Sequence, residues 1–103
     1  MIIPSNRLPV HHLHPAVRLM LITADSVYHE HGVDRVRARA CGASTSWDGD
    51  TKTTTARAKL DVDNVPAGEA PRIADDIEDT LPAEYTAAHE DPGIVVRYEE
   101  TTQ

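Results

Sequence analysis

The sequence predicts an α+β domain, in which helices pack on one face of a small, largely antiparallel sheet. Apolar residues recur at helical spacing over 15–31 and 71–81, and they alternate strictly with polar residues over 57–63. Two more short strands, 85–89 and 94–99, are joined by the turn residues Asp-Pro-Gly. The 103 residues suffice for one domain with one modest core.

The chain divides into three parts. Met1–Leu13 contains two prolines and no hydrophobic period. We therefore expect residues 1–14 to form an extended arm, residues 15–99 the single α+β domain, and residues 100–103 a C-terminal tail.

The first predicted helix covers 15–31. Pro15 suits the first helical position, and Gly32 suits the position just after a helix. Leu19 and Ile22 lie off its main apolar stripe. They indicate a helix that is buried on a second side or contacts a partner chain.

The remaining elements follow in order. Residues 34–41 alternate arginines with small apolar residues and predict a strand with a basic outer face. Residues 42–52 are rich in Gly, Ser, Thr and Asp and predict a loop. Strand 57–63, a turn over 64–70 and helix 71–81 come next. The final hairpin completes the sheet, in which we expect 94–99 to pair with 57–63.

Charge is distributed unevenly along the chain. The net charge is −7, but residues 1–47 carry five basic and three acidic groups, while residues 48–103 carry five and fourteen. An acidic C-terminal half argues against nucleic-acid binding there. The single Cys41 excludes an internal disulfide. We find no signal-peptide pattern in the first ten residues and no apolar stretch of membrane-spanning length.

Four short sequence strings, in this order along the chain, carry a resemblance to a known family. Leu-His-Pro at 13–15 opens a helix, Ala-Lys-Leu-Asp-Val at 58–62 follows a polar loop, Leu-Pro-Ala-Glu-Tyr stands at 81–85, and Val-Arg-Tyr at 96–98 closes the hairpin. With this order of elements, the chain resembles the zinc D-alanyl-D-alanine carboxypeptidases and L-alanyl-D-glutamate peptidases, including phage endolysin domains. The resemblance implies a hedgehog/DD-peptidase-like fold over about residues 13–98.

The family's metal motif, Ser-x-His-x-x-Gly-x-Ala-x-Asp followed later by Glu-x-x-His, is incomplete here. Placing its Asp on Asp61 puts the first ligand His at Thr54, the general-base Glu at Glu90 and the last ligand His at Gly93. Placing it on Asp63 instead puts the first His at Ala56. Catalytic zinc needs three protein ligands, and both histidines are absent. Asp61 and Glu90 are then vestigial positions, and we expect no cofactor and no catalysis.

Other residues offer alternative chemistry. Asp61 and Asp63 form a remnant metal site or a solvated strand face. The N-terminal histidines at 11, 12 and 14 match no structural zinc spacing, but they or His89 would have to replace the missing ligands in an active enzyme.

Two functions therefore compete. The first is a non-catalytic peptidase-like domain that acts as a structural or assembly subunit, specifically a phage virion protein located in the virion or the host cytoplasm. The alternative is a zinc-dependent peptidoglycan peptidase with substituted ligands.

The assembly hypothesis names a partner surface. We expect another protein subunit to contact the apolar arm residues and the basic strand face, and we expect neither nucleic acid nor membrane as a partner. In a homo-oligomeric ring, the basic face would meet the acidic 75–79 stretch of the next copy. The partner-binding residues are Ile2, Ile3, Leu8, Val10, Arg35, Arg37 and Arg39.

Overall fold

A computed structural model gives the structure of the chain and describes residues 2–4, 14–33, 36–62, 65–66, 68–90 and 93–103. Five strands form one sheet in the order β1-β2-β3-β5-β4. The elements are β1 (Ile2–Pro4), α1 (Pro15–Glu30), β2 (Val36–Asp48), β3 (Thr51–Asp61), α2 (Ala70–Thr80), β4 (Tyr85–Glu90) and β5 (Gly93–Thr102). Strands β2 to β5 pair antiparallel, and β1 pairs parallel to β2. The predicted α+β class and the largely antiparallel sheet are confirmed.

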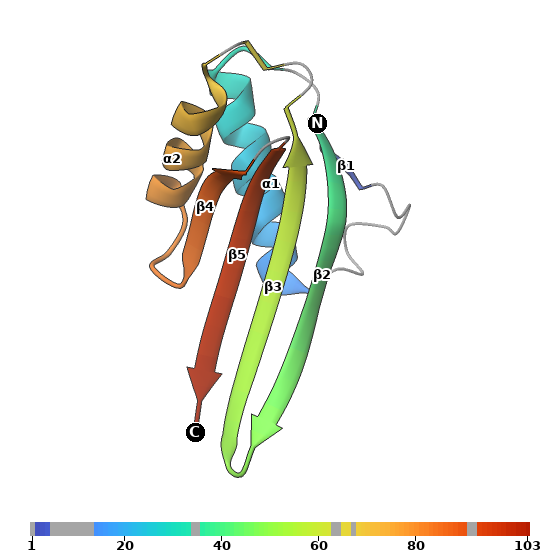
Figure 1. Ribbon diagram of the computed structural model, residues 1–103, viewed down its shortest axis with the longest axis vertical. Coiled ribbons are helices and arrows are strands. Elements are labelled where there is room, and N and C mark those ends of the chain that lie inside the picture. Colours follow the sequence, from blue (N-terminus) through green and yellow to red (C-terminus); the bar gives the residue numbers. More distant parts are fainter. Residues whose placement is uncertain (1, 5–13, 34–35, 63–64, 67, 91–92) are drawn as a thin grey trace.

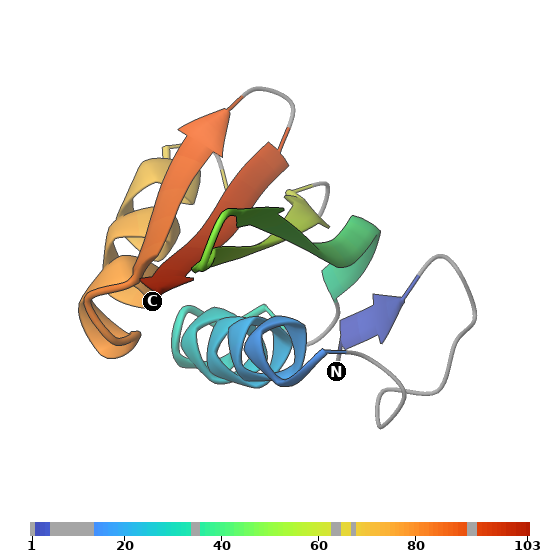
Figure 2. The same ribbon diagram turned by 90° about the horizontal axis from the view of Figure 1, so that it is seen from below.

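Both helices lie on one face of the sheet (Figure 2). We call this side the helix-side face and the other the open face. The core fills the space between them and includes Met20, Tyr28, Leu60, Ile73 and Ile94, all with no exposed surface. Among the described residues, neither helix is long and apolar enough to cross a membrane.

Helix α1 begins and ends where its local sequence predicts. The Nδ1 atom of His14 accepts a hydrogen bond from the backbone N–H of Ala16 (3.1 Å), and Pro15 occupies the first turn. Gly32 follows the helix with φ of +81°, a conformation that favours glycine. Leu19 and Ile22 are 38% and 63% exposed, so they are off the buried stripe as expected, and the described residues do not bury a second side of the helix there.

The strands extend farther than their sequences predict. The prediction of a loop over 42–52 is wrong, because β2 and β3 form one long hairpin closed by a turn at Gly49 and Asp50. Threonine favours strands, and a glycine with positive φ at the first of the two central turn positions, as Gly49 has, favours a two-residue hairpin turn, so the local chemistry agrees with the hairpin. Strand β5 continues through Thr102, past the expected domain end at residue 99. The predicted pairing of 57–63 with 94–99 is confirmed over the described part.

The end of the sheet near the hairpin turn projects beyond both helices (Figure 1). It consists of residues 42–48 of β2, 51–55 of β3 and 99–102 of β5, and we call it the distal sheet. Hydroxyl groups link its strands, including Ser44 to Thr55 at 3.0 Å and Thr53 to Thr101 at 3.3 Å. The sheet is therefore covered on one face at one end and on neither face at the other.

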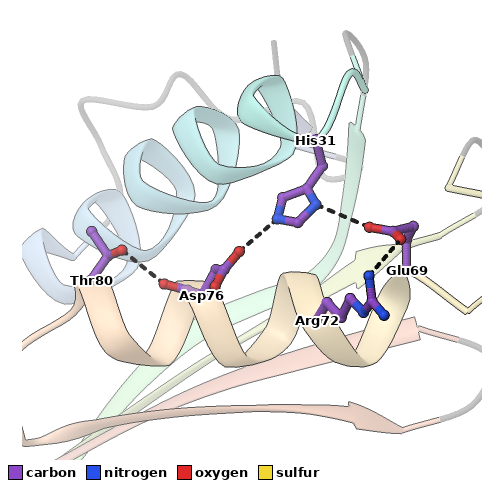
Figure 3. Close-up of polar contacts among 5 residues, drawn as sticks. All are labelled: His31, Glu69, Arg72, Asp76 and Thr80. Carbon is purple, nitrogen blue, oxygen red and sulfur yellow. Dashed lines mark hydrogen bonds and ion pairs between the residues drawn. The ribbon is translucent and has the colours of Figure 1, made fainter.

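An ionic contact joins the C-terminal end of α1 to the side of α2 (Figure 3). His31 caps the end of α1, and its ring nitrogens lie 3.1 Å from a carboxylate oxygen of Glu69 and 2.6 Å from one of Asp76. The hydrogen bond with Asp76 is the main cause that raises the pKa of His31. The contact with Glu69 raises this pKa further, and partial burial opposes both. A protonated imidazole, which donates from both nitrogens, suits this position.

The first prediction is that His31→Gln removes a pH-dependent part of the stability. Because the folded-state pKa of His31 lies above the unfolded value, this contribution is complete below about pH 6.5. It disappears as pH rises through the raised folded-state pKa. The melting temperature of the wild type should therefore exceed that of His31→Gln at pH 5.5, and the difference should shrink by pH 8.5.

Thermal melts followed by circular dichroism at five pH values provide the measurement. His89→Gln is the matched control, since His89 is exposed on β4 and contacts no carboxylate among the described residues. A wild-type advantage over His31→Gln that stays constant with pH would contradict the role of this contact.

Candidate functional site

Three of the positions that the resemblance assigns to the metal site lie in one row across the sheet. Asp61 of β3 pairs with Gly93 of β5, and Gly93 pairs with Glu90 of β4. The row lies at the end of the sheet away from the hairpin turn. Residues that are distant in sequence therefore meet where the resemblance expects a site.

Asp61 is engaged by neighbouring groups. The Nε atom of Arg39 lies 2.8 Å from one carboxylate oxygen of Asp61 and 3.0 Å from the other. The buried Tyr28 hydroxyl donates to the backbone carbonyl of Asp61 at 3.5 Å. This contact ties α1 to the end of β3, and burial raises the pKa of Tyr28 well above its usual value. The Asp61 side chain thus forms an ion pair with Arg39 between the neighbouring strands β2 and β3.

Glu90 forms a bidentate hydrogen-bonded ion pair with Arg97. Arg97 donates from its two terminal nitrogens to the two carboxylate oxygens of Glu90, at 2.6 and 3.3 Å. This hydrogen bonding is the main cause that lowers the pKa of Glu90, and the nearby positive charges of Lys59 and Arg57 lower it further. A general base works best with a pKa near the working pH. Glu90 is therefore a weak base with both oxygens already occupied.

Thr54 lies far from this row. It pairs with Glu100, whereas Asp61 pairs with Gly93, and both lie on the one continuous strand β3. Seven residues at about 3.3 Å each separate Thr54 and Asp61 by about 23 Å. Zinc ligands must all lie within about 2.3 Å of the ion. A histidine at position 54 would not reach an ion bound at Asp61 in this fold.

Gly93 has no room for a side chain. A Cβ atom built there would lie 2.4 Å from the backbone carbonyl oxygen of Leu60, far inside van der Waals contact. The strands β3 and β5 are thus packed around a glycine at the position of the last ligand. The residues present do not fit a catalytic zinc ion, for reasons of geometry as well as residue type.

His14 and His89, the two proposed substitutes that the structure describes, do not lie beside Asp61. His89 pairs with the buried core residue Ile94, so it belongs to the helix-side face, opposite Glu90. His14 caps the start of α1, about 20 Å along the helix from Tyr28 at about 1.5 Å per residue. The histidines at 11 and 12 lie outside the described residues. In the described part of the chain, no three His, Cys, Asp or Glu side chains lie close enough together to hold a metal ion.

The open face carries a cluster of cations that we call the basic face. Arg37 and Arg39 are exposed on either side of the buried Ala38 in β2. The pairing register places three more cations on the same side, namely Arg57, Lys59 and Arg97. Asp61 and Glu90 neutralise two of the five. Arg37, Arg57 and Lys59 have no ion-pair partner among the described residues.

A hollow of about 770 Å³ borders the basic face toward the distal sheet. Arg57 and Arg97 lie directly opposite each other in the pairing register, and Glu84 and Glu99 also line the hollow. Like charges that face each other across a ladder are unfavourable. Glu90 already neutralises Arg97, so Arg57 is the cation of this pair that has no ion-pair partner among the described residues.

The predicted partner-binding residues have mixed outcomes. Ile2 and Ile3 pair through their backbones with Val36 and Arg37 of the same chain. Leu8, Val10 and Arg35 lie outside the described residues, as does Asp63 of the predicted remnant metal site. Arg37 and Arg39 are exposed, as expected. Contact of any of these residues with another chain stays a prediction.

Sequence reasoning missed the contributions of Arg57, Lys59 and Arg97 to this surface. Alternation over 57–63 placed Lys59 and Asp61 on one polar face, but it did not place the arginines of β2 beside them. The register between strands depends on tertiary contacts that local periodicity does not encode.

Comparison of the chain with protein-family models, with curated proteins and with solved structures finds no match.

The second prediction concerns the close approach at Gly93. Gly93→Ala should destabilise the fold by about 1–3 kcal/mol, because the new methyl group overlaps a backbone atom that no rotamer change can move. Gly42→Ala is the matched control, since a Cβ atom there meets nothing within 4 Å and the backbone is not in the left-handed region. It should change stability by less than about 0.5 kcal/mol or increase it slightly.

Urea denaturation of the two variants and the wild type gives the free energies. Equal stabilities for Gly93→Ala and Gly42→Ala would show that β3 and β5 are not held at this distance in solution.

Proposed function

We propose that this domain is a non-catalytic, peptidase-like module that serves as a structural or assembly subunit. By resemblance to the zinc peptidases of phage endolysins, we further propose that it belongs to a phage virion. The fold-level part of this proposal, a hedgehog/DD-peptidase-like scaffold, is supported by the order of elements and by the row of Asp61, Gly93 and Glu90. Thr54, the remaining position of the motif, lies about 23 Å from that row and does not support it. The virion setting rests on analogy with the family.

The non-catalytic part is supported by the geometry of that row. Without a bound ion, no group would lower the pKa of an attacking water or polarise a scissile carbonyl. Arg97 already binds both carboxylate oxygens of Glu90. The close approach of the backbone at Gly93 leaves no space for the side chain of a third ligand. These features disfavour the alternative, a zinc peptidase with substituted ligands.

The observation that carries the assembly role is the separation of charge. A chain of net charge −7 collects five cations on the basic face, three of them without an acidic partner in the described part. The opposite charge lies on α2, where Asp75 and Asp79 are exposed. Because the two surfaces belong to different sides of the molecule, they complement each other between copies in a head-to-tail contact.

The third prediction is that Zn²⁺ does not bind stoichiometrically at Asp61. We expect isothermal titration calorimetry at pH 7, on protein without a histidine tag, to show no tight one-to-one event. Only one zinc-ligand side chain of the family pattern is present at the row, and it is already paired with Arg39.

Asp48→Ala is the control variant for Asp61→Ala. It also removes one carboxylate, but from a position beside the hairpin turn and away from the row. Tight binding that Asp61→Ala abolishes and Asp48→Ala preserves would restore the peptidase alternative.

The fourth prediction is that the full chain assembles through the basic face. Multi-angle light scattering at low salt should give a mass above the 11.3 kDa chain. Arg57→Glu/Lys59→Glu and Asp75→Lys/Asp79→Lys should each shift the protein toward monomer, because each places like charges together. An equimolar mixture of the two variants should assemble again, since each copy then offers the charge that the other lacks.

Deletion of residues 1–13 tests the arm: the domain should stay folded by circular dichroism and assemble more weakly. Assembly that is unchanged by the deletion would show that residues 1–13 do not take part in the contact between chains. A monomeric wild type that also has no partner in its native particle would contradict the structural-subunit function as a whole.

A further inference from the structure

One edge of the distal sheet has no partner strand within the described chain. Strand β1 pairs only with residues 36–38 of β2, at the end away from the hairpin turn. Beyond this point β2 is the outermost strand, since the sheet order places only β1 on that side. The backbone groups that point outward from 39–48 therefore have no sheet partner among the described residues.

This edge lacks the usual protection against pairing with another chain. Protected edges carry lysine, proline or inward-pointing charges, or are interrupted by bulges. The only irregularity of β2 lies between Arg39 and Gly42, where Ala40 has φ of +47°. From Gly42 to Asp48 the pairing with β3 is regular, and all the residues are exposed. The side chains of 42–46 are small and uncharged and do not obstruct an approaching strand.

The other free edge of the distal sheet is unlike it. There β5 extends beyond β4, whose register ends at Tyr85 opposite Tyr98. Glu99 and Glu100 follow at once and would repel an identical edge. Of the two edges, β2 is the one suited to self-pairing.

We propose that β2 pairs antiparallel with β2 of a second copy, about a twofold axis at Thr45, so that the two sheets become one. The inference rests on the proposed assembly function and adds a twofold contact to it. In a contact of this symmetry the same strand supplies both sides, and each residue and its partner exchange roles between the copies.

The register about Thr45 places no two like charges and no two bulky side chains opposite each other. Ser44 lies beside Ser46 of the other copy, Gly42 lies beside Asp48, and Ala43 lies beside Trp47. Trp47 is 67% exposed, although it contacts Lys52 of the same chain, whose ammonium lies 5.9 Å from the ring centre. Pairing of the two copies packs this indole against the Ala43 methyl group of the other copy, on the helix-side face. Such aromatic cross-strand pairs stabilise sheets.

The charges favour the antiparallel direction and a second copy as the occupant. The basic end of β2 carries Arg37 and Arg39, and its other end leads to Asp48 and Asp50. Antiparallel pairing brings the acidic turn of each copy toward the basic end of the other, and parallel pairing would place like charges together. The partner's turn ends near the point where β1 begins to pair, so β1 stays in place.

The experiment uses the full chain with Thr45→Lys and Thr45→Glu, each alone and mixed. At the axis two copies of residue 45 face each other, so either variant alone places like charges in contact and should weaken the dimer about tenfold or more. The equimolar mixture should recover a dimer, because lysine then faces glutamate. Sedimentation equilibrium measures the dissociation constants against the 11.3 kDa chain.

Thr101→Lys is the matched control. Thr101 is an exposed threonine of the distal sheet that contacts β3 through its hydroxyl, as Thr45 does, but it lies on the β5 edge. It should leave the dimer unchanged. Circular dichroism must show that all variants are folded, which the exposure of Thr45 favours.

The outcomes separate this inference from the proposed function. A dimer dissociation constant that is the same for Thr45→Lys and the wild type, with assembly lost in Arg57→Glu/Lys59→Glu, would overturn the twofold contact and keep the assembly function. Loss of the dimer in both residue-45 variants with no recovery on mixing would also overturn the contact at Thr45. Recovery on mixing, with Thr101→Lys unaffected, is the result that supports it.

Discussion

The architecture depends on a mismatch of lengths between strands and helices. Strand β2 has 13 residues and spans about 43 Å at about 3.3 Å per residue, whereas α1 has 16 residues and spans about 24 Å at about 1.5 Å per residue. Because β3 and β5 remain paired along the whole of β3, the sheet stays intact where the helices end. The core and the ion-paired row therefore lie at one end, and an uncovered sheet lies at the other.

An uncovered sheet must gain its stability without a core, and the composition of the distal sheet reflects this requirement. Threonine and serine dominate it, and β-branched side chains with hydroxyl groups favour strands while remaining compatible with water. Cross-strand pairs such as Thr45 with Thr54 contribute about 0.2–1 kcal/mol each. This same composition led sequence reasoning to predict a loop, since serine, threonine and glycine are also the residues of turns.

The sequence was informative wherever one side of an element is buried. Helix α1 and the alternation of Ala58, Leu60 and their polar neighbours were predictable, because burial imposes a period of 3.6 or 2 on apolar residues. The distal sheet has no buried face and thus no such period. The site was only partly predictable: the resemblance named Asp61, Glu90 and Gly93, but the pairing of Glu90 with Arg97 and the approach of Leu60 to Gly93 follow from the strand register.

The features of the ion-paired row support one another physically. A glycine at position 93 lets the backbone of β3 and β5 approach closely, and the continuous β3 carries position 54 away from the row. Carboxylates left on an open face with no metal ion would repel each other, and Arg39 and Arg97 each neutralise one of them. Those two arginines share the face with Arg57, Lys59 and Arg37, so the surface as a whole becomes cationic. Under the proposed relationship, the residues that satisfy the vestigial carboxylates also form the centre of a surface that attracts an acidic partner.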